Sequence, residues 1–215
     1  MQILKILSSC LVAFFLFGVV AMGEVSPVIS LDEMNELREL LVNGGFESNS
    51  QNGASGYKYN AAIDGWSPAV TNSGFYGTST PGSALVPTAT GGGYATFFQV
   101  QGTANISSVS LSQTITNRVE GDCRYRFFAA TRRDGDNMLV RLFIDNVERG
   151  SFLVDSKVAT WFEADDIYLT EGEHTFTIHV TSRIDGDHTV AIYAISLESQ
   201  PLPYPTIMVD RKSVV

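Results

Sequence analysis

The sequence predicts an all-β protein, an antiparallel jelly-roll β-sandwich preceded by one short helix. Three observations predict this fold class. Three segments of the second half alternate apolar and more polar residues, residues 49–93 are rich in Gly, Ser, Asn, Thr and Pro, and a single segment has helical periodicity. About eight to ten strands with so little helix favour two packed antiparallel sheets.

The first 23 residues have the pattern of a secretory signal peptide. Lys5 supplies a positive charge, residues 11–20 are apolar, and Ala21-Met22-Gly23 places small residues before a cleavage point at Glu24. The apolar run is too short to span a bilayer as a helix. We therefore expect a secreted protein, extracellular or periplasmic, that has no membrane contact after cleavage.

The mature chain is expected to be strongly acidic. Cleavage would leave 192 residues with 13 basic and 23 acidic side chains, a net charge of −10. Such a surface repels phosphate backbones, which argues against nucleic acid as a partner. Cys123 would be its only cysteine, so the sequence predicts neither an internal disulfide nor a Cys/His zinc site. The fold must be stabilised by its core.

Residues 24–40 are predicted to form a linker and an amphipathic helix, the helix spanning about residues 31–41. Ser30 and Glu33 fit a capping box. Apolar residues follow at helical spacing, namely Leu31, Met34, Leu37, Leu40 and Leu41. This helix would either cover an edge of the sandwich or dock against a partner chain.

Residues 41–198 form the predicted sandwich domain. Alternation is clearest at residues 108–115, 138–145 and 175–181, where one side of each strand is apolar. Such a period of two places that side in a core. The tail at residues 199–215 contains three prolines and is predicted to be extended.

Two Asp-Gly turns interrupt the alternating segments. Because four strands lie between them, both turns should lie at the same end of an antiparallel sandwich. The turns carry four carboxylates, Asp134, Asp136, Asp185 and Asp187. These side chains would share a cation or keep the rim soluble.

Four short motifs follow one another in an order that resembles a known family. They are LVNGGFES from residue 41, IDGWSPA from 63, LFIDNVERG from 142 and VAIYAISLE from 190. The order is similar to that of the cellulose- and xylan-binding carbohydrate-binding modules of the galactose-binding-like jelly-roll superfamily. The resemblance covers roughly residues 41–198. It implies a non-catalytic protein whose partner is a poly- or oligosaccharide.

The resemblance also implies a core residue and a cofactor. Phe46 would enter the core, and Glu47 would help to hold a structural calcium ion together with an Asp of the last strand. This chain has Tyr193-Ala194 where the family carries that Asp. Calcium prefers six to eight oxygen ligands, so the missing carboxylate weakens the predicted site.

Sugar binding needs flat aromatic faces and polar side chains that bond hydroxyl groups in pairs. Many aromatics of this chain should be core, and Trp66 is structural in the resembling family. Arg126 and Phe128 share one face of a strand, which is either a polar groove walled by loop aromatics or a solvated outer face. The candidate ligand-binding residues are Tyr57, Tyr59, Trp66, Phe75, Tyr76, Tyr94, Arg126 and Phe128.

No catalytic residue is predicted. Glu163 and Asp165 lack the second Glu that laminarinase-type hydrolases use, and the three histidines have no nucleophile with a clear signature. Two alternatives to glycan binding remain open. One is a structural or adhesive surface protein that contacts extracellular protein or matrix, and the other is a small secreted hydrolase or lyase that acts on glycans.

Overall fold

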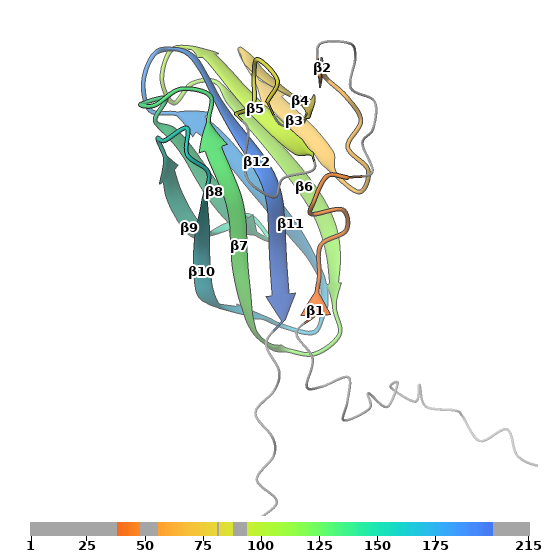
Figure 1. Cartoon of the computed structure of the whole chain (residues 1–215). Helices are drawn as coiled ribbons and strands as arrows, with labels where there is room; N and C mark the ends of the chain where they lie inside the picture. The colour runs from red at the N-terminus through yellow and green to blue at the C-terminus, as the bar shows by residue number, and fades with distance from the viewer. Residues whose placement is uncertain (1–37, 48–55, 81, 88–93, 200–215) are drawn as a thin grey trace, which may run out of the picture. The chain divides into compact units, whose positions relative to one another are not determined.

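The computed structural model describes residues 38–47, 56–80, 82–87 and 94–199, which form two antiparallel sheets that face each other (Figure 1). Within these ranges the chain forms strands, turns and loops and no helix, so nothing in them could cross a bilayer as a helix. The predicted fold class, an antiparallel jelly-roll β-sandwich, is confirmed.

The larger sheet has seven strands in the order β10-β7-β12-β5-β4-β2, with β1 paired to the far end of β12. Its strands are β1 (Arg38–Glu39), β2 (Tyr57–Tyr59), β4 (Gly74–Ser79), β5 (Ala95–Gly102), β7 (Gly121–Thr131), β10 (Thr160–Leu169) and β12 (Gly186–Ser199). Pairing β1 with β12 brings the two ends of the described chain side by side, Arg38 opposite Ser199.

The smaller sheet has five strands in the order β3-β6-β11-β8-β9. They are β3 (Ser67–Thr71), β6 (Ser108–Asn117), β8 (Met138–Ile144), β9 (Val147–Val154) and β11 (Gly172–Ser182). The alternation predicted for β6, β8 and β11 is confirmed, because their apolar sets are buried and face the larger sheet. Large aromatics from both sheets fill the space between them, among them Tyr125, Phe127 and Phe176.

The NGGF turn ties the first described segment to the last strand. Phe46 is fully buried, as predicted, and its ring lies 6.0 Å from that of Trp66. The Ile195 amide donates to the Gly44 carbonyl at 2.9 Å, and a Cβ at Gly44 would overlap the Ile195 carbonyl oxygen. Buried Gln113 accepts from the Val42 amide at 2.7 Å and donates to the Val42 carbonyl at 3.0 Å. Glycine is required at position 44, because a Cβ there would overlap the backbone of β12.

Most of the helix predicted at residues 31–41 lies outside the described ranges, and the described end of that segment is not helical. Arg38 and Glu39 form β1, and the Glu39 carboxylate accepts hydrogen bonds from the amides of Leu41 and Leu197. Pairing with β12 has prevailed over the apolar periodicity of this segment, as tertiary context often does. Residues 31–37, the signal peptide and the tail from residue 200 lie outside the described ranges.

Candidate functional site

The outer face of the larger sheet carries the candidate site. Along β5, Phe98 and Val100 point into the core, so Gln99 and Gln101 project from the opposite side. On β4, Tyr76 packs against the core, and Phe75 therefore lies on the outer face beside the two glutamines.

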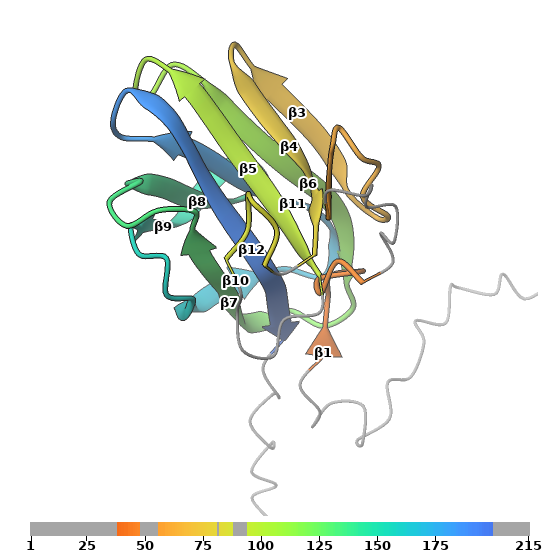
Figure 2. The same ribbon diagram turned by 45° about the horizontal axis from the view of Figure 1, so that its top comes forward.

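Residues 82–87, hereafter the covering segment, lie across the middle of this face (Figure 2). Leu85 and Val86 bury Phe97 together with small side chains of β7 and β12. The Tyr193 hydroxyl donates to the Pro87 carbonyl at 2.7 Å and fixes the end of the segment. The covering segment thus separates the β2–β4–β5 part of the face from the part formed by β7 and β10.

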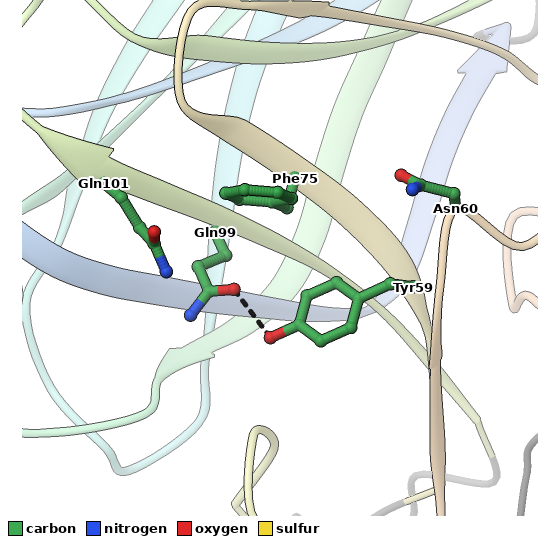
Figure 3. A pocket seen from close by; sticks show the side chains of 5 residues that line it. All are labelled: Tyr59, Asn60, Phe75, Gln99 and Gln101. Carbon is green, nitrogen blue, oxygen red and sulfur yellow. Dashed lines mark hydrogen bonds between the residues drawn. The ribbon is translucent and has the colours of Figure 1, made fainter.

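A pocket opens on the β2–β4–β5 side, with a volume of about 390 Å³ (Figure 3). Its walls are formed by Tyr59, Asn60, Phe75, Gln99 and Gln101. The rings of Tyr59 and Phe75 lie 6.0 Å apart at 72°, which forms an aromatic corner. Small-molecule sites span about 300–1,000 Å³, so this pocket is of a size that suits a small-molecule ligand.

A chain of hydrogen bonds runs from the pocket across the sheet. The Tyr59 hydroxyl donates to Gln99 Oε1 at 2.7 Å, Gln99 Nε2 donates to Asp187 Oδ1 at 2.6 Å, and Arg132 donates to Asp187 Oδ2 at 2.8 Å. Burial raises the pKa of Tyr59, so its hydroxyl keeps its proton at neutral pH. Burial would also raise the pKa of Asp187, but hydrogen bonds from Arg132 and Gln99 outweigh it and lower that pKa.

The structure brings some of the predicted ligand residues together. Tyr59 and Phe75 line the pocket, and Tyr57 stands beside it with its ring 5.8 Å from that of Tyr59. Tyr94 immediately precedes β5 and is half-buried. These positions follow from the sheet order, because β2, β4 and β5 are neighbours.

Two predicted ligand residues pack against the core, Trp66 as a buried residue and Tyr76 as a partly buried one. Trp66 is 6% exposed, packs between Phe46 and Phe176, and donates its indole N–H to the Asn43 carbonyl. Tyr76 packs against the same core from β4. Neither side chain lies on the face that carries the pocket, so neither is part of this candidate site.

Arg126 and Phe128 share the outer face with the pocket but lie beyond the covering segment. Phe128 packs on Trp161 with ring centroids 5.1 Å apart, and the Arg126 guanidinium lies over Trp161 at 5.2 Å. Arg126 also pairs with Glu198 at 3.1 Å. The single groove predicted from Tyr57 to Phe128 is therefore divided into two surfaces.

The polar residues of the pocket escaped the sequence analysis. The sequence does not single out Asn60, Gln99 or Gln101, and it predicts Asp187 only as part of the acidic rim. A signal for two of them was available, because ATFFQVQG places Gln99 and Gln101 on the same side of a strand. Which side faces solvent depends on the partner sheet, and the sequence does not show that.

The acidic rim exists, but its carboxylates have separate partners. The Arg183 backbone amide donates to the Asn137 carbonyl at 3.0 Å, which joins the two turns. Asp134 pairs with Lys157, Asp136 with His188, Asp187 with Arg132, and Asp185 accepts from the Ala104 amide. The part of the chain that the structure describes holds no group of three or more His, Cys, Asp or Glu side chains placed for a metal ion.

The predicted calcium ligand Glu47 is exposed at the edge of the described chain. The nearby Gly44 carbonyl accepts the Ile195 amide, and the Asn43 carbonyl accepts the Phe46 amide and the Trp66 indole. Calcium needs six to eight oxygen ligands, of which Glu47 would supply only its carboxylate. Residues 48–55 lie outside the described ranges, and calcium at Glu47 stays a prediction.

Asp145, in the β8–β9 turn, and His174, on β11, form a carboxylate–imidazole pair that makes the stability of the fold depend on pH. His174 Nδ1 lies 2.7 Å from Asp145 Oδ2, and this hydrogen bond raises the pKa of His174 above 6.5. The same bond lowers the pKa of Asp145 below 3.8. A raised histidine pKa stabilises the fold below pH 6.5, and the stabilisation is lost as the pH rises through the folded-state pKa.

We therefore expect the thermal unfolding midpoint to fall between pH 6 and pH 8, and to fall less in His174→Gln. The Asp145 contribution is present above pH 3.8 and is lost on further acidification. His179→Gln is the matched control, because burial lowers the pKa of His179 and its effect appears only below pH 6.5. An unchanged pH profile in His174→Gln would contradict the assignment.

No family model matches this sequence, and no curated protein matches it either. Solved structures do match. TmCBM61 in complex with β-1,4-galactotriose aligns with a TM-score of 0.55 and 19% identity, covering 76% of this chain and 99% of that one. An apo form cyclase from Fischerella sp. aligns with a TM-score of 0.57 and 11% identity, over 78% and 98% of the two chains.

A third match is a domain within a larger protein. The enzymatically active domain of bacteriophage CBA120 tailspike protein 4 aligns with a TM-score of 0.50 and 14% identity, over 74% of this chain and 21% of that one. At these identities the matches show the fold alone. The chain therefore has the jelly-roll fold of carbohydrate-binding modules, a fold that cyclase and tailspike structures share, and function must be argued from the site.

Proposed function

We propose that this protein is a secreted, non-catalytic carbohydrate-binding protein that holds a neutral poly- or oligosaccharide in the pocket of Tyr59, Phe75, Gln99 and Gln101. The observation that carries the proposal is the aromatic corner of Tyr59 and Phe75, set beside the side-chain amides of Asn60 and Gln101. Aromatic rings stack on the C–H faces of pyranoses, and amides bond pairs of hydroxyl groups. Asn60 and Gln101 line the pocket, and among the described residues their side chains have no hydrogen-bond partner.

The charge of the site supports binding of a neutral ligand without catalysis. Asp187 is the carboxylate in the hydrogen-bond chain, and its lowered pKa keeps it ionised and bound to Arg132. A glycosidase needs a protonated carboxyl group and a second carboxylate about 5–10 Å away. Asp187 suits neither role, because both of its oxygens already accept hydrogen bonds.

Affinity electrophoresis on a panel of neutral glycans tests the proposal. We would use β-1,4-galactan, xylan and soluble cellulose derivatives, at low and high salt. The mature protein should be retarded by at least one of them, equally at both salt concentrations, because neutral sugars offer no ionic partner. A parallel reducing-end assay should detect no cleavage. Released reducing ends would establish the enzyme alternative, and retardation by none would favour adhesion to protein or matrix.

Export is part of the same proposal and has its own test. Cleavage after Gly23 should yield a secreted chain that begins at Glu24, because Ala21-Met22-Gly23 fits a signal-peptidase site. N-terminal sequencing of protein recovered from outside the cytoplasm should return Glu24 as the first residue. Recovery of Met1 from that fraction would refute the assignment.

A further inference from the structure

The Asp187 carboxylate fixes the direction of the hydrogen bonds that link it to Gln99 and Tyr59. Gln99 is 3% exposed and bridges Tyr59 and Asp187, with Nε2 2.6 Å from Asp187 Oδ1. An ionised carboxylate only accepts hydrogen bonds. Gln99 must therefore turn its nitrogen toward Asp187 and its oxygen toward Tyr59, because the reverse orientation would place two acceptors 2.6 Å apart.

Asp187 is held in turn by arginines of the β7–β8 turn. Arg132 donates to Asp187 Oδ2 at 2.8 Å and to the Asp187 carbonyl at 3.1 Å, and Arg133 lies 3.7 Å from the same Oδ2. The Arg132 side chain is largely buried. These contacts keep the carboxylate charged and prevent it from rotating away from Gln99.

The direction of these hydrogen bonds determines whether the Tyr59 hydroxyl acts as a donor or as an acceptor toward a ligand. Its hydroxyl donates its one proton to Gln99, so only the lone pairs of its oxygen remain. We propose that Asp187 is a positioning residue that makes Tyr59 Oη a hydrogen-bond acceptor toward the pocket. The site then selects sugars with a free hydroxyl at the contacted position over analogues that carry fluorine or a methyl ether there.

Replacing Asp187 with asparagine should invert this polarity. Arg132 requires an acceptor, so the amide oxygen of the new side chain would face Arg132 and its NH₂ group would face Gln99. Gln99 would then present its oxygen to residue 187 and its NH₂ group to Tyr59, which releases the Tyr59 proton toward the ligand. A merely structural Asp187 would show no such reversal.

The inference rests on the proposed glycan binding, and its ligand test uses β-1,4-galactobiose and its monodeoxyfluoro derivatives. The wild-type protein should bind one derivative about tenfold more weakly than the parent sugar, the effect of one lost hydrogen bond. In Asp187→Asn that ratio should fall to about one or reverse, and Tyr59→Phe should abolish the discrimination. A uniform loss across all sugars in Asp187→Asn would overturn the positioning role.

A measurement without ligand tests the same hydrogen bonds. The side-chain amide resonances of Gln99, identified by their loss in Gln99→Leu, should shift as Asp187 is protonated below pH 3.8. They should show no such titration in Asp187→Asn. If the Gln99 resonances do not shift when Asp187 is protonated, the inference is overturned, even if the sugar derivatives bind as expected. If no glycan binds at all, the proposed function is contradicted instead.

Discussion

Replacing Trp66 with alanine should lower the free energy of unfolding by about 3–5 kcal/mol, the usual cost of removing a large buried aromatic side chain. Trp66 is 6% exposed, and its ring lies 6.0 Å from Phe46 and 5.9 Å from Phe176. Its indole N–H bonds the Asn43 carbonyl, so the change also removes a contact that holds the NGGF turn. Urea unfolding followed by circular dichroism measures the loss.

Trp161→Ala is the matched control for this experiment. Trp161 is 52% exposed on the edge strand β10 and contacts Phe128 and Arg126. Its loss should cost no more than about 1–2 kcal/mol, because it removes one ring contact and a cation–π pair. Equal destabilisation by the two changes would contradict a core role for Trp66. A Trp66→Ala protein of normal stability that fails to bind glycan would place Trp66 in the ligand site.

Replacing Phe75 with alanine should weaken glycan binding by at least about tenfold, since a stacking ring contributes on the order of 1–3 kcal/mol. Phe75 is half-buried on the outer face of β4 and forms one wall of the pocket. Its ring contacts Tyr59 and is not part of either buried apolar cluster. The fold should therefore survive, and isothermal titration calorimetry with the bound glycan measures the change.

Arg126→Ala provides the comparison within the same face. Arg126 lies beyond the covering segment, where it pairs with Glu198 and stacks on Trp161. If the glycan is confined to the pocket, this change should leave the affinity within about twofold of wild type, as expected of a substitution outside the contacts. A tenfold loss in Arg126→Ala with normal binding in Phe75→Ala would move the site to β7 and β10.

The strands were predictable from the sequence where one face is buried and the other is solvated. Along β8, Met138, Val140 and Leu142 alternate with residues that are less buried, and these three are buried in the structure as predicted. Phe46 was predicted as core from a motif that resembles known modules, and it is fully buried. Such patterns reflect a periodicity of two that a sheet imposes on its own residues.

The divided outer face was not predictable, because it depends on a loop that no periodicity describes. Leu85 and Val86 cover Phe97 only because residues 82–87 fold back over β5 and β12. The strand at Arg38–Glu39, where the sequence predicted the end of a helix, has a similar cause, since the Glu39 carboxylate accepts a hydrogen bond from the Leu197 amide across the sheet. In both cases contacts between distant segments decide the structure, and a local pattern carries no information about them.

The pocket as the glycan site is tested most directly by nuclear magnetic resonance of the ¹⁵N-labelled protein as glycan is added. We expect the largest amide shifts at Tyr59, Asn60, Phe75, Gln99 and Gln101, which line the pocket. The amide resonances of Arg126, Phe128 and Trp161, which lie beyond the covering segment, should not shift. Shifts confined to β7 and β10, with the pocket residues unmoved, would contradict the account.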